Sequence, residues 1–193
     1  VGSEMCIRDR YNVKVTFFVT NTHPDYQNLI AEEAKRGHTV AIHSASHKYD
    51  QIYTSEQAFF DDLEQMNSII KAQTGNDASI IRFPGGSSNT VSKDYCPGIM
   101  TQLVNDVTAR GLLYCDWNVS SGDANSKPIS TEQVVQNVIS GVQSHNVSVV
   151  LQHDIKDFSV NAVEQIIQWG QANGYTFLPL TTSSPMSHHR VNN

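Results

Sequence analysis

The sequence predicts an α/β protein built around a mostly parallel sheet. Two observations predict it: short apolar runs alternate with amphipathic helical patterns from Val13 onward, and the changeovers carry helix-capping residues and glycines. This alternation favours parallel strands joined by helical crossovers, arranged as an open sheet or as a barrel. At 193 residues, the chain is long enough to bury the core of one domain.

Strands are predicted where short runs rich in Val, Ile, Phe or Leu are bounded by turn or polar residues. In chain order these runs are residues 13–20, 39–43, 79–83, 112–117, 147–153 and 176–180. A helix is predicted in each gap between them, from apolar residues three or four positions apart and from the caps. The helices cover residues 29–34 before Gly37, a segment from a cap at Thr54 or Ser55 to Gly75, residues 99–107 before Gly111, a segment from a cap at Ser130 to Val142, and a segment from a cap at Ser159 to Gly174.

The composition excludes several classes of protein. A hydrophobic content of 39% with 17% charged residues is typical of a soluble globular chain. A net charge of −6 argues against nucleic acid or an anionic membrane as the partner. No apolar run has the length of a membrane-spanning segment. Three cysteines exclude a fully paired framework, although Cys96 and Cys115 could pair.

Both ends of the chain differ from the segment between them. Residues 1–10 have no clear period, and we interpret them as an unrelated leader that is not native. The domain then covers residues 11–182, and the polar residues 183–193 are predicted to be a flexible tail. His188 and His189 are accordingly expected to be surface residues and not metal ligands.

Candidate catalytic residues follow four of the predicted strands. Active sites of parallel α/β folds form at the carboxyl ends of the strands, so these side chains are expected to face one another. They are His43 and His47, Arg82 with Pro84 and Gly85, Trp117 with Asp123, and Leu151 with His153.

Each candidate has a chemical and a plain structural interpretation. Two imidazoles four residues apart, His43 and His47, can bind one divalent metal from the same side. Arg82 is costly to bury without a carboxylate partner, and a salt-bridged residue at the rim is the plain alternative. His153 suits protonation of a leaving group near neutral pH, but it also fits a hydrogen-bonded core position. Asp123 could pair with His153 or Arg82, or simply turn the loop.

Several motifs occur in the order found in one enzyme family. Residues 37–47 read Gly-His-Thr-Val-Ala-Ile-His-Ser-Ala-Ser-His, similar to a metal motif written Gly-His-Glu-x-x-x-His-Ser/Thr-x-x-His. Residues 82–86 are similar to Arg-x-Pro-x-Gly, residues 117–123 to a fourth motif, and residues 151–154 to Leu-x-His-Asp. On these residues the chain resembles the polysaccharide deacetylase family (carbohydrate esterase family 4, the NodB-homology domain) from Tyr11 to Leu180.

The resemblance implies a fold, a metal and a reaction. The fold would be a distorted, incomplete (β/α) barrel, and the reaction would be metal-dependent hydrolysis of acetyl groups on a glycan. His43 and His47 would hold the metal, commonly zinc, and His153 would be the general acid. Arg82 and Asp123 would orient and tune the acid and the base. Pro84 and Gly85 would approach the substrate, and Trp117 and Leu151 would form the apolar slot for the acetyl methyl group.

The chain departs from the family pattern in two places. Ala124 follows Asp123 where the family often has Trp. The first motif, Thr-Phe-Asp-Asp-Gly, is missing; it is expected about twenty residues before Thr16, with a strand and a helix. One of its aspartates would be the base and the other the third metal ligand. We therefore expect a domain without its first strand and helix, which binds zinc weakly and is nearly inactive.

Two other functions fit parts of the pattern. A deacetylase-like domain that binds glycan without reacting would show sugar binding and no acetate release. An unrelated metal-dependent barrel enzyme, such as an isomerase or amidohydrolase, would have more metal ligands on other strands. Among deacetylase substrates, peptidoglycan is favoured over chitin and acetylated xylan, and the expected setting is bacterial, secreted or at the cell surface.

Overall fold

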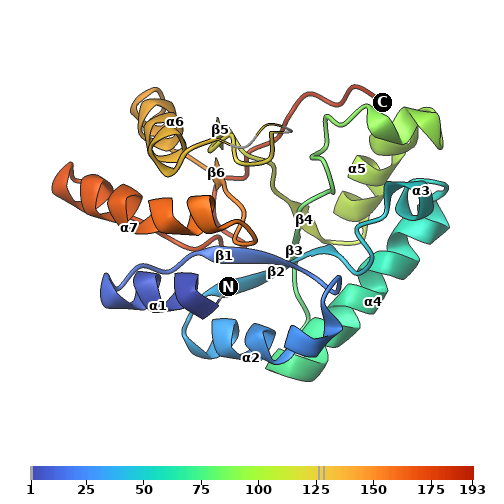
Figure 1. Ribbon diagram of the computed structural model, residues 1–193. Helices are drawn as coiled ribbons and strands as arrows, with labels where there is room; N and C mark the ends of the chain where they lie inside the picture. Colours follow the sequence, from blue (N-terminus) through green and yellow to red (C-terminus); the bar gives the residue numbers. More distant parts are fainter. Residues whose placement is uncertain (1, 126, 128) are drawn as a thin grey trace. The chain divides into compact units, whose positions relative to one another are not determined.

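The computed structural model describes residues 2–125, 127 and 129–193, which form two compact units. One unit combines the segment up to Val15 with Trp117–Leu178. The other combines Thr16–Asp116 with Pro179–Asn193. The chain therefore passes from the first unit to the second and back, and it returns to the second for its last residues (Figure 1).

The unit of Thr16–Asp116 is built on a parallel sheet in the order β1-β2-β3-β4. Between β1 and β2, Phe17 pairs with Val40, and the register of the two strands shifts at the end of β1. Four predicted strands are thus confirmed in position. The strands β1, β3 and β4 are shorter than the predicted apolar runs, whereas β2 extends one residue beyond its predicted end. The strands are β1 Thr16–Thr20, β2 Thr39–Ser44, β3 Ile80–Ile81 and β4 Leu113–Tyr114.

Local signals set the helices of this unit. The Ser55 hydroxyl accepts a hydrogen bond from the Ala58 amide and caps α4, and Gly75 ends it at φ 81°. Helices α2 and α4 pack against β2 and against each other (Figure 1). The unit also contains η1 Pro24–Tyr26, α2 Asn28–Lys35, α3 Tyr49–Ile52, α4 Glu56–Thr74, η2 Val91–Asp94 and α5 Ile99–Ala109. Its core includes Ile42, Ile52, Phe60, Met66, Phe83, Met100 and Leu103.

The other unit pairs two short parallel strands and packs helices together. Helix α6 lies against α7, and the apolar residues predicted on both helices form its core. A side chain at Gly141 would collide with Val119, so this position of α6 requires glycine. The elements are α1 Gly2–Arg10, β5 Val119–Ser120, α6 Thr131–Gln143, β6 Val150–Leu151 and α7 Asp157–Ala172.

Residues 1–10 contain a helix that the sequence did not predict. Helix α1 packs beside α7, where Met5 is buried and Ile7 contacts the cluster of Val13, Val163 and Ile167. The segment has no continuous apolar stripe, so periodicity gave no signal for it. The interpretation of residues 1–10 as a non-native leader stays a prediction.

Two element predictions near the end of the chain are wrong. Residues 176–180 form no strand; instead the Leu180 backbone is held by the side chains of Thr16 and Thr39. Helix α7 begins at Asp157 with Lys156 at the cap position, and not at a Ser159 cap. Ser159 is buried, and its hydroxyl donates a hydrogen bond to the Asp123 carboxylate and does not cap the helix.

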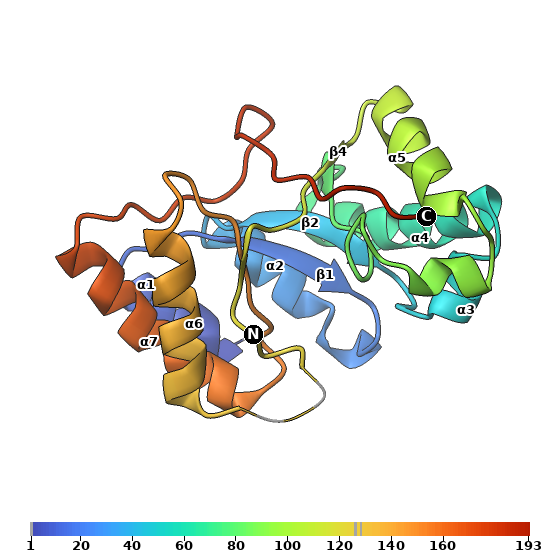
Figure 2. The same cartoon turned by 90° about the horizontal axis from the view of Figure 1, so that it is seen from above.

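The last residues are bonded to distant segments along their length, and the flexible tail stays a prediction. His188 stacks on Tyr114 with ring centroids 4.0 Å apart, and its Nε2 lies 3.0 Å from the Tyr114 carbonyl oxygen. The His189 amide donates to the Asp116 carboxylate at 2.9 Å. Asn193 accepts from the amide of Thr101 on α5, where the tail ends (Figure 2). These contacts could not be predicted from the sequence, because the partners of the polar tail residues lie in distant segments of the chain.

Two further observations concern the cysteines and the membrane. Cys6, Cys96 and Cys115 are free thiols, so Cys96 and Cys115 do not pair. None of the described helices combines the length and apolar character that a bilayer crossing requires.

Candidate active site

The histidine pair lies at the carboxyl end of β2, as the spacing predicts. His43 belongs to the strand and His47 to the turn after it, and their Nε2 atoms lie 3.2 Å apart. The Nδ1 atom of His43 lies 2.7 Å from the carbonyl oxygen of Arg82. Because a carbonyl only accepts, Nδ1 carries the proton, and Nε2 is the nitrogen that faces His47.

This arrangement fits a divalent metal. Two nitrogens bound to one tetrahedral zinc at 2.0–2.1 Å would lie about 3.3 Å apart, close to the separation in the pair. Fixing of Nδ1 by a carbonyl is also the usual support for a metal-bound histidine. Within the described part of the chain, no group of three or more His, Cys, Asp or Glu side chains could hold a metal. The residues present thus supply two imidazole ligands.

Arg82 ties β3 to the end of β4. Its Nε and Nη2 donate to the backbone carbonyls of Cys115 and Asp116 at 2.8 and 2.9 Å, and its guanidinium lies 4.0 Å from the centre of the Phe18 ring. Burial lowers the pKa of Arg82, but the group stays charged at neutral pH. The sequence did not indicate these two carbonyl partners. Through these bonds the Arg82 side chain fixes the end of β3. The backbone carbonyl of Arg82, at the same strand end, is the group that is bonded to His43.

The loop after Arg82 is turned by glycine. Gly85 and Gly86 both adopt φ 78°, and a side chain at Gly85 would come within 2.8 Å of the Tyr49 hydroxyl. The Tyr53 hydroxyl donates to the Pro84 carbonyl at 2.7 Å. Pro84 and Gly85 are thus held against α3, close to His47, whose ring meets that of Tyr49 edge to face. Their predicted contact with substrate stays a prediction.

Asp116 is a structural residue that the sequence reasoning missed. It is fully buried, and its carboxylate accepts from the amide and hydroxyl of Ser87 and from the His189 amide. It joins the glycine loop to the tail of the chain. An aspartate within the apolar run 112–117 was the available signal, since a buried charge needs partners.

His153 and Asp123 form a bonded pair in the other unit. The Nδ1 of His153 lies 2.8 Å from Asp123 Oδ1, and the His153 amide donates to Oδ2 at 2.7 Å. The Ser159 hydroxyl donates to Oδ2 at 2.6 Å, and the Lys156 ammonium donates to the Asp123 carbonyl. The His153 side chain is 37% exposed, so a buried core histidine is the wrong interpretation. Asp123 is thus bonded to His153, which is one of the roles considered for it.

Hydrogen bonding keeps Asp123 ionised despite its burial. Burial alone raises the pKa of a carboxyl group, but the bonds from His153 and Ser159 outweigh it and lower the pKa of Asp123 to about 2. The Asp123 side chain is 1% exposed, so these bonds are shielded from water. At neutral pH the carboxylate can hold the Nδ1 proton and stabilise a charged imidazole.

Trp117 and Leu151 are both partly buried residues of this unit. Trp117 stands two residues before β5, and Leu151 ends β6, the strand that leads to His153. Leu151 pairs with Ser120 in the short ladder. Their predicted role as walls of an acetyl slot stays a prediction.

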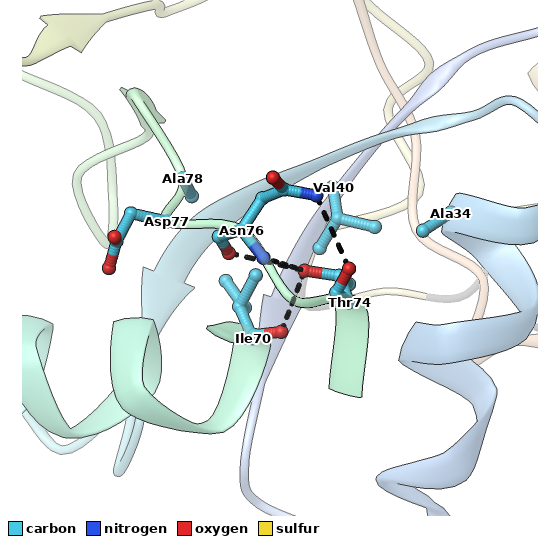
Figure 3. Close-up of a pocket in the computed structure, with 7 residues that line it drawn as sticks. All are labelled: Ala34, Val40, Ile70, Thr74, Asn76, Asp77 and Ala78. Carbon is cyan, nitrogen blue, oxygen red and sulfur yellow. Dashed lines mark hydrogen bonds between the residues drawn. The ribbon is translucent and has the colours of Figure 1, made fainter. Parts of the chain in front are cut away.

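A pocket of about 170 Å³ lies away from these residues, at the start of β2 (Figure 3). Its polar lining is bonded internally: the Thr74 hydroxyl donates to the Ile70 carbonyl, and the Asn76 side chain to the Thr74 carbonyl. Its wall holds no histidine, cysteine or arginine, so it adds nothing to the catalytic candidates. The lining residues are Ala34, Val40, Ile70, Thr74, Asn76, Asp77 and Ala78.

Known proteins similar to the chain share a fold and related names. Residues 7–96 match the family model described as polysaccharide deacetylase. The crystal structure of the catalytic domain of peptidoglycan N-acetylglucosamine deacetylase from Eubacterium rectale is 93% identical with a TM-score of 0.99, covering 100% of this chain and 87% of that one. A polysaccharide deacetylase from Bacillus cereus is 24% identical with a TM-score of 0.78, covering 99% of this chain and 89% of that one, and shows the fold. The predicted α/β fold is confirmed.

A curated relative from Bacillus cereus is named peptidoglycan-N-acetylglucosamine deacetylase. It is 28% identical over 173 residues, which are 87% of this chain. The chain spans 60% of the length of that relative.

Proposed function

Because the chain belongs to the polysaccharide deacetylase family, we propose that it carries the groups of a metal-dependent hydrolase that removes the acetyl group from N-acetylglucosamine in peptidoglycan. The observation that carries this proposal is the histidine pair, whose two Nε2 atoms lie 3.2 Å apart at a strand end. The substrate class rests on the name of the 93% identical relative. Peptidoglycan lies outside the cell membrane, so the proposed setting is extracellular or at the cell surface.

His43 and His47 would hold the metal, and zinc fits their nitrogen donors. A bound zinc supplies Lewis acidity, which polarises the acetamide carbonyl and lowers the pKa of a water molecule. The Arg82 carbonyl keeps the His43 ring in the tautomer whose Nε2 faces the metal position. Arg82 itself acts by fixing that carbonyl.

His153 would give its Nε2 proton to the departing amine. Asp123 holds the proton on Nδ1 and, being ionised, stabilises the imidazolium before the transfer. Pro84 and Gly85 would approach the sugar, and Trp117 and Leu151 would exclude water from the acetyl methyl group. These roles are supported by the resemblance of the surrounding motifs to those of the family.

For the sequence as it stands, we propose weak zinc binding and slow turnover. Its residues supply two imidazole ligands, and the family's Asp-Asp motif is not among the residues before Thr16. Two ligands hold zinc less tightly than three or four. Loss of a general base slows hydrolysis by roughly 10²–10⁴-fold.

Acetate release from peptidoglycan fragments tests the proposal. Three proteins would be compared with zinc present. They are this chain, a grafted chain in which residues 1–10 are replaced by a segment that carries the family's first motif with its strand and helix, and the grafted chain with His153→Ala. The grafted chain should release acetate, and this chain should be slower by a factor of about 10² or more. His153→Ala should slow the grafted chain by a similar factor.

Other outcomes would identify the error. Equal rates with and without the graft would show that this sequence needs no further base. A grafted chain that binds the glycan but releases no acetate would favour the non-catalytic, glycan-binding function. Activity unchanged by His153→Ala would remove His153 from the reaction.

A further inference from the structure

Asp62 of α4 binds the short turn that joins the two histidines. Its Oδ2 accepts from the Ser44 hydroxyl at 2.6 Å and from the Ala45 amide at 2.8 Å. Its Oδ1 accepts from the Ser46 amide at 2.8 Å. One carboxylate therefore takes three hydrogen bonds from three consecutive residues, and all three lie between His43 and His47.

The turn has a conformation that needs such support. His47 adopts φ 55°, a left-handed conformation that is unfavourable for a residue other than glycine. The His47 amide donates to the Ser44 oxygen at 2.8 Å, and the same Ser44 hydroxyl donates to Asp62. The Asp62 carboxylate is thus linked to the backbone of His47 through Ser44.

Helix α4 provides a rigid base for Asp62. Phe59, Leu63 and Met66, on the turns around it, are buried in the core of this unit. Ser44 and Ala45 are also buried, with exposed fractions of 1% and 4%, so water competes little for these bonds. The turn is therefore held against a helix that packing already fixes.

Only a carboxylate matches these donors. An ionised Asp offers two acceptor oxygens and no donor, whereas Asn offers one oxygen and an amino group. In an Asp62→Asn variant, the amino group would face either the Ser46 amide or the donors of Ser44 and Ala45. The neighbouring Asp61 is exposed, and its carboxylate accepts a hydrogen bond from the Gln57 side chain on the same helix.

We propose that Asp62 is a positioning residue of the His43–His47 metal site. It holds residues 44–46 so that the His47 imidazole meets that of His43, while the Arg82 carbonyl orients the His43 ring. The inference rests on the proposed metal site and adds to it a residue outside its sequence motif. Supporting groups of this kind typically contribute 10–100-fold to metal affinity.

The test compares Asp62→Asn with Asp61→Asn in the full chain. Asp61→Asn is the matched control, because it makes the same chemical change one residue away. Two quantities would be measured: amide hydrogen exchange of Ala45, Ser46 and His47 without metal, and Zn²⁺ affinity by competition with a chromogenic chelator. His47→Ala, measured in the same assay, reports whether zinc binds at the pair.

We expect Asp62→Asn to speed exchange at the three amides and to weaken Zn²⁺ binding by about 10–100-fold, with Asp61→Asn unchanged in both. The Ser44→Ala variant keeps the two bonds from the backbone amides to Asp62, so it should also weaken Zn²⁺ binding, but by a smaller factor. It replaces Asp62→Asn in the test if that variant does not fold. Zinc affinity equal in the two Asn variants, alongside a weakened His47→Ala, would overturn the role of Asp62. Affinity unchanged in His47→Ala would instead overturn the metal site itself.

Discussion

The two histidine sites of the molecule are held by different chemistry. His43 is oriented by the neutral backbone carbonyl of Arg82, and its second nitrogen faces another imidazole. His153 is oriented by the ionised carboxylate of Asp123, to which both its ring and its amide are bonded. A neutral hydrogen-bond acceptor suits an imidazole that gives a lone pair to a metal. An anionic acceptor suits an imidazole that carries a proton.

The comparison contrasts two ways of orienting the same side chain. Both sites lie at the ends of parallel strands. What differs is the partner of Nδ1, which is a backbone carbonyl at His43 and a carboxylate at His153. Each of the following experiments changes one side of this comparison.

Replacing Asp123 should have the largest effect on stability. In Asp123→Ala, the His153 amide and the Ser159 hydroxyl lose a buried acceptor, so the free energy of unfolding should fall by about 3 kcal/mol. Urea denaturation followed by circular dichroism measures it. Asp157→Asn, an exposed change on the first turn of α7, should cost under about 1 kcal/mol. Similar losses in both variants would mean that the Asp123 bonds contribute little.

The second effect concerns zinc. His47→Ala should weaken Zn²⁺ binding by about 100-fold or more, equivalent to about 2.8 kcal/mol, because one of two ligands is removed. His153→Ala should leave the affinity unchanged, since its ring is committed to Asp123. Calorimetric titration of both variants gives the result. Weaker binding in His153→Ala would erase the distinction between the two sites.

The third effect is a pH dependence. The pKa of Asp123 is about 2 in the folded protein and near 3.8 when unfolded, so the ionised group stabilises the fold by about 2 kcal/mol above pH 4. That contribution is lost as the pH falls from about 4 toward 2. Unfolding free energies measured across this range should decline less in Asp123→Asn than in the parent. Parallel declines would assign the acid sensitivity to other groups.

The smallest effect concerns the loop beside the histidine pair. Gly85→Ala places a side chain at φ 78° and against the Tyr49 hydroxyl, which should cost about 1–2 kcal/mol. Gly98→Ala is the control: it has φ 87° but open space around it, so it isolates the backbone cost. Thermal melts of both variants suffice. A Gly85→Ala protein as stable as Gly98→Ala would show that the Tyr49 contact is easily relieved.

The sequence predicted what is encoded locally. Ser55 and Gly75 bound α4, and Ser130 caps α6, because these signals act within one helical turn. The four-residue spacing of His43 and His47 likewise brought the two rings together. Apart from the strand at residues 39–43, the predicted strands were too long, since an apolar run marks burial and not the extent of a ladder.

Features that depend on distant residues were missed. Asp62 binds the turn 16–18 residues before it, and Asp116 joins Ser87 to His189 across 29 and 73 residues. No period or short motif marks such bonds. The contacts of the tail were missed for the same reason, because the partners of His188 and Asn193 lie far back in the chain. The pairing of His153 with Asp123 was one of several alternatives until the structure selected it.

The most direct test of the two roles is a zinc titration followed by nitrogen NMR of the histidine rings. The account predicts that zinc shifts the Nε2 signals of His43 and His47, while the ring signals of His153 keep the pattern of an Nδ1 proton bonded to Asp123. A shift of His153 at the same or lower zinc concentration, with His43 and His47 unaffected, would contradict it.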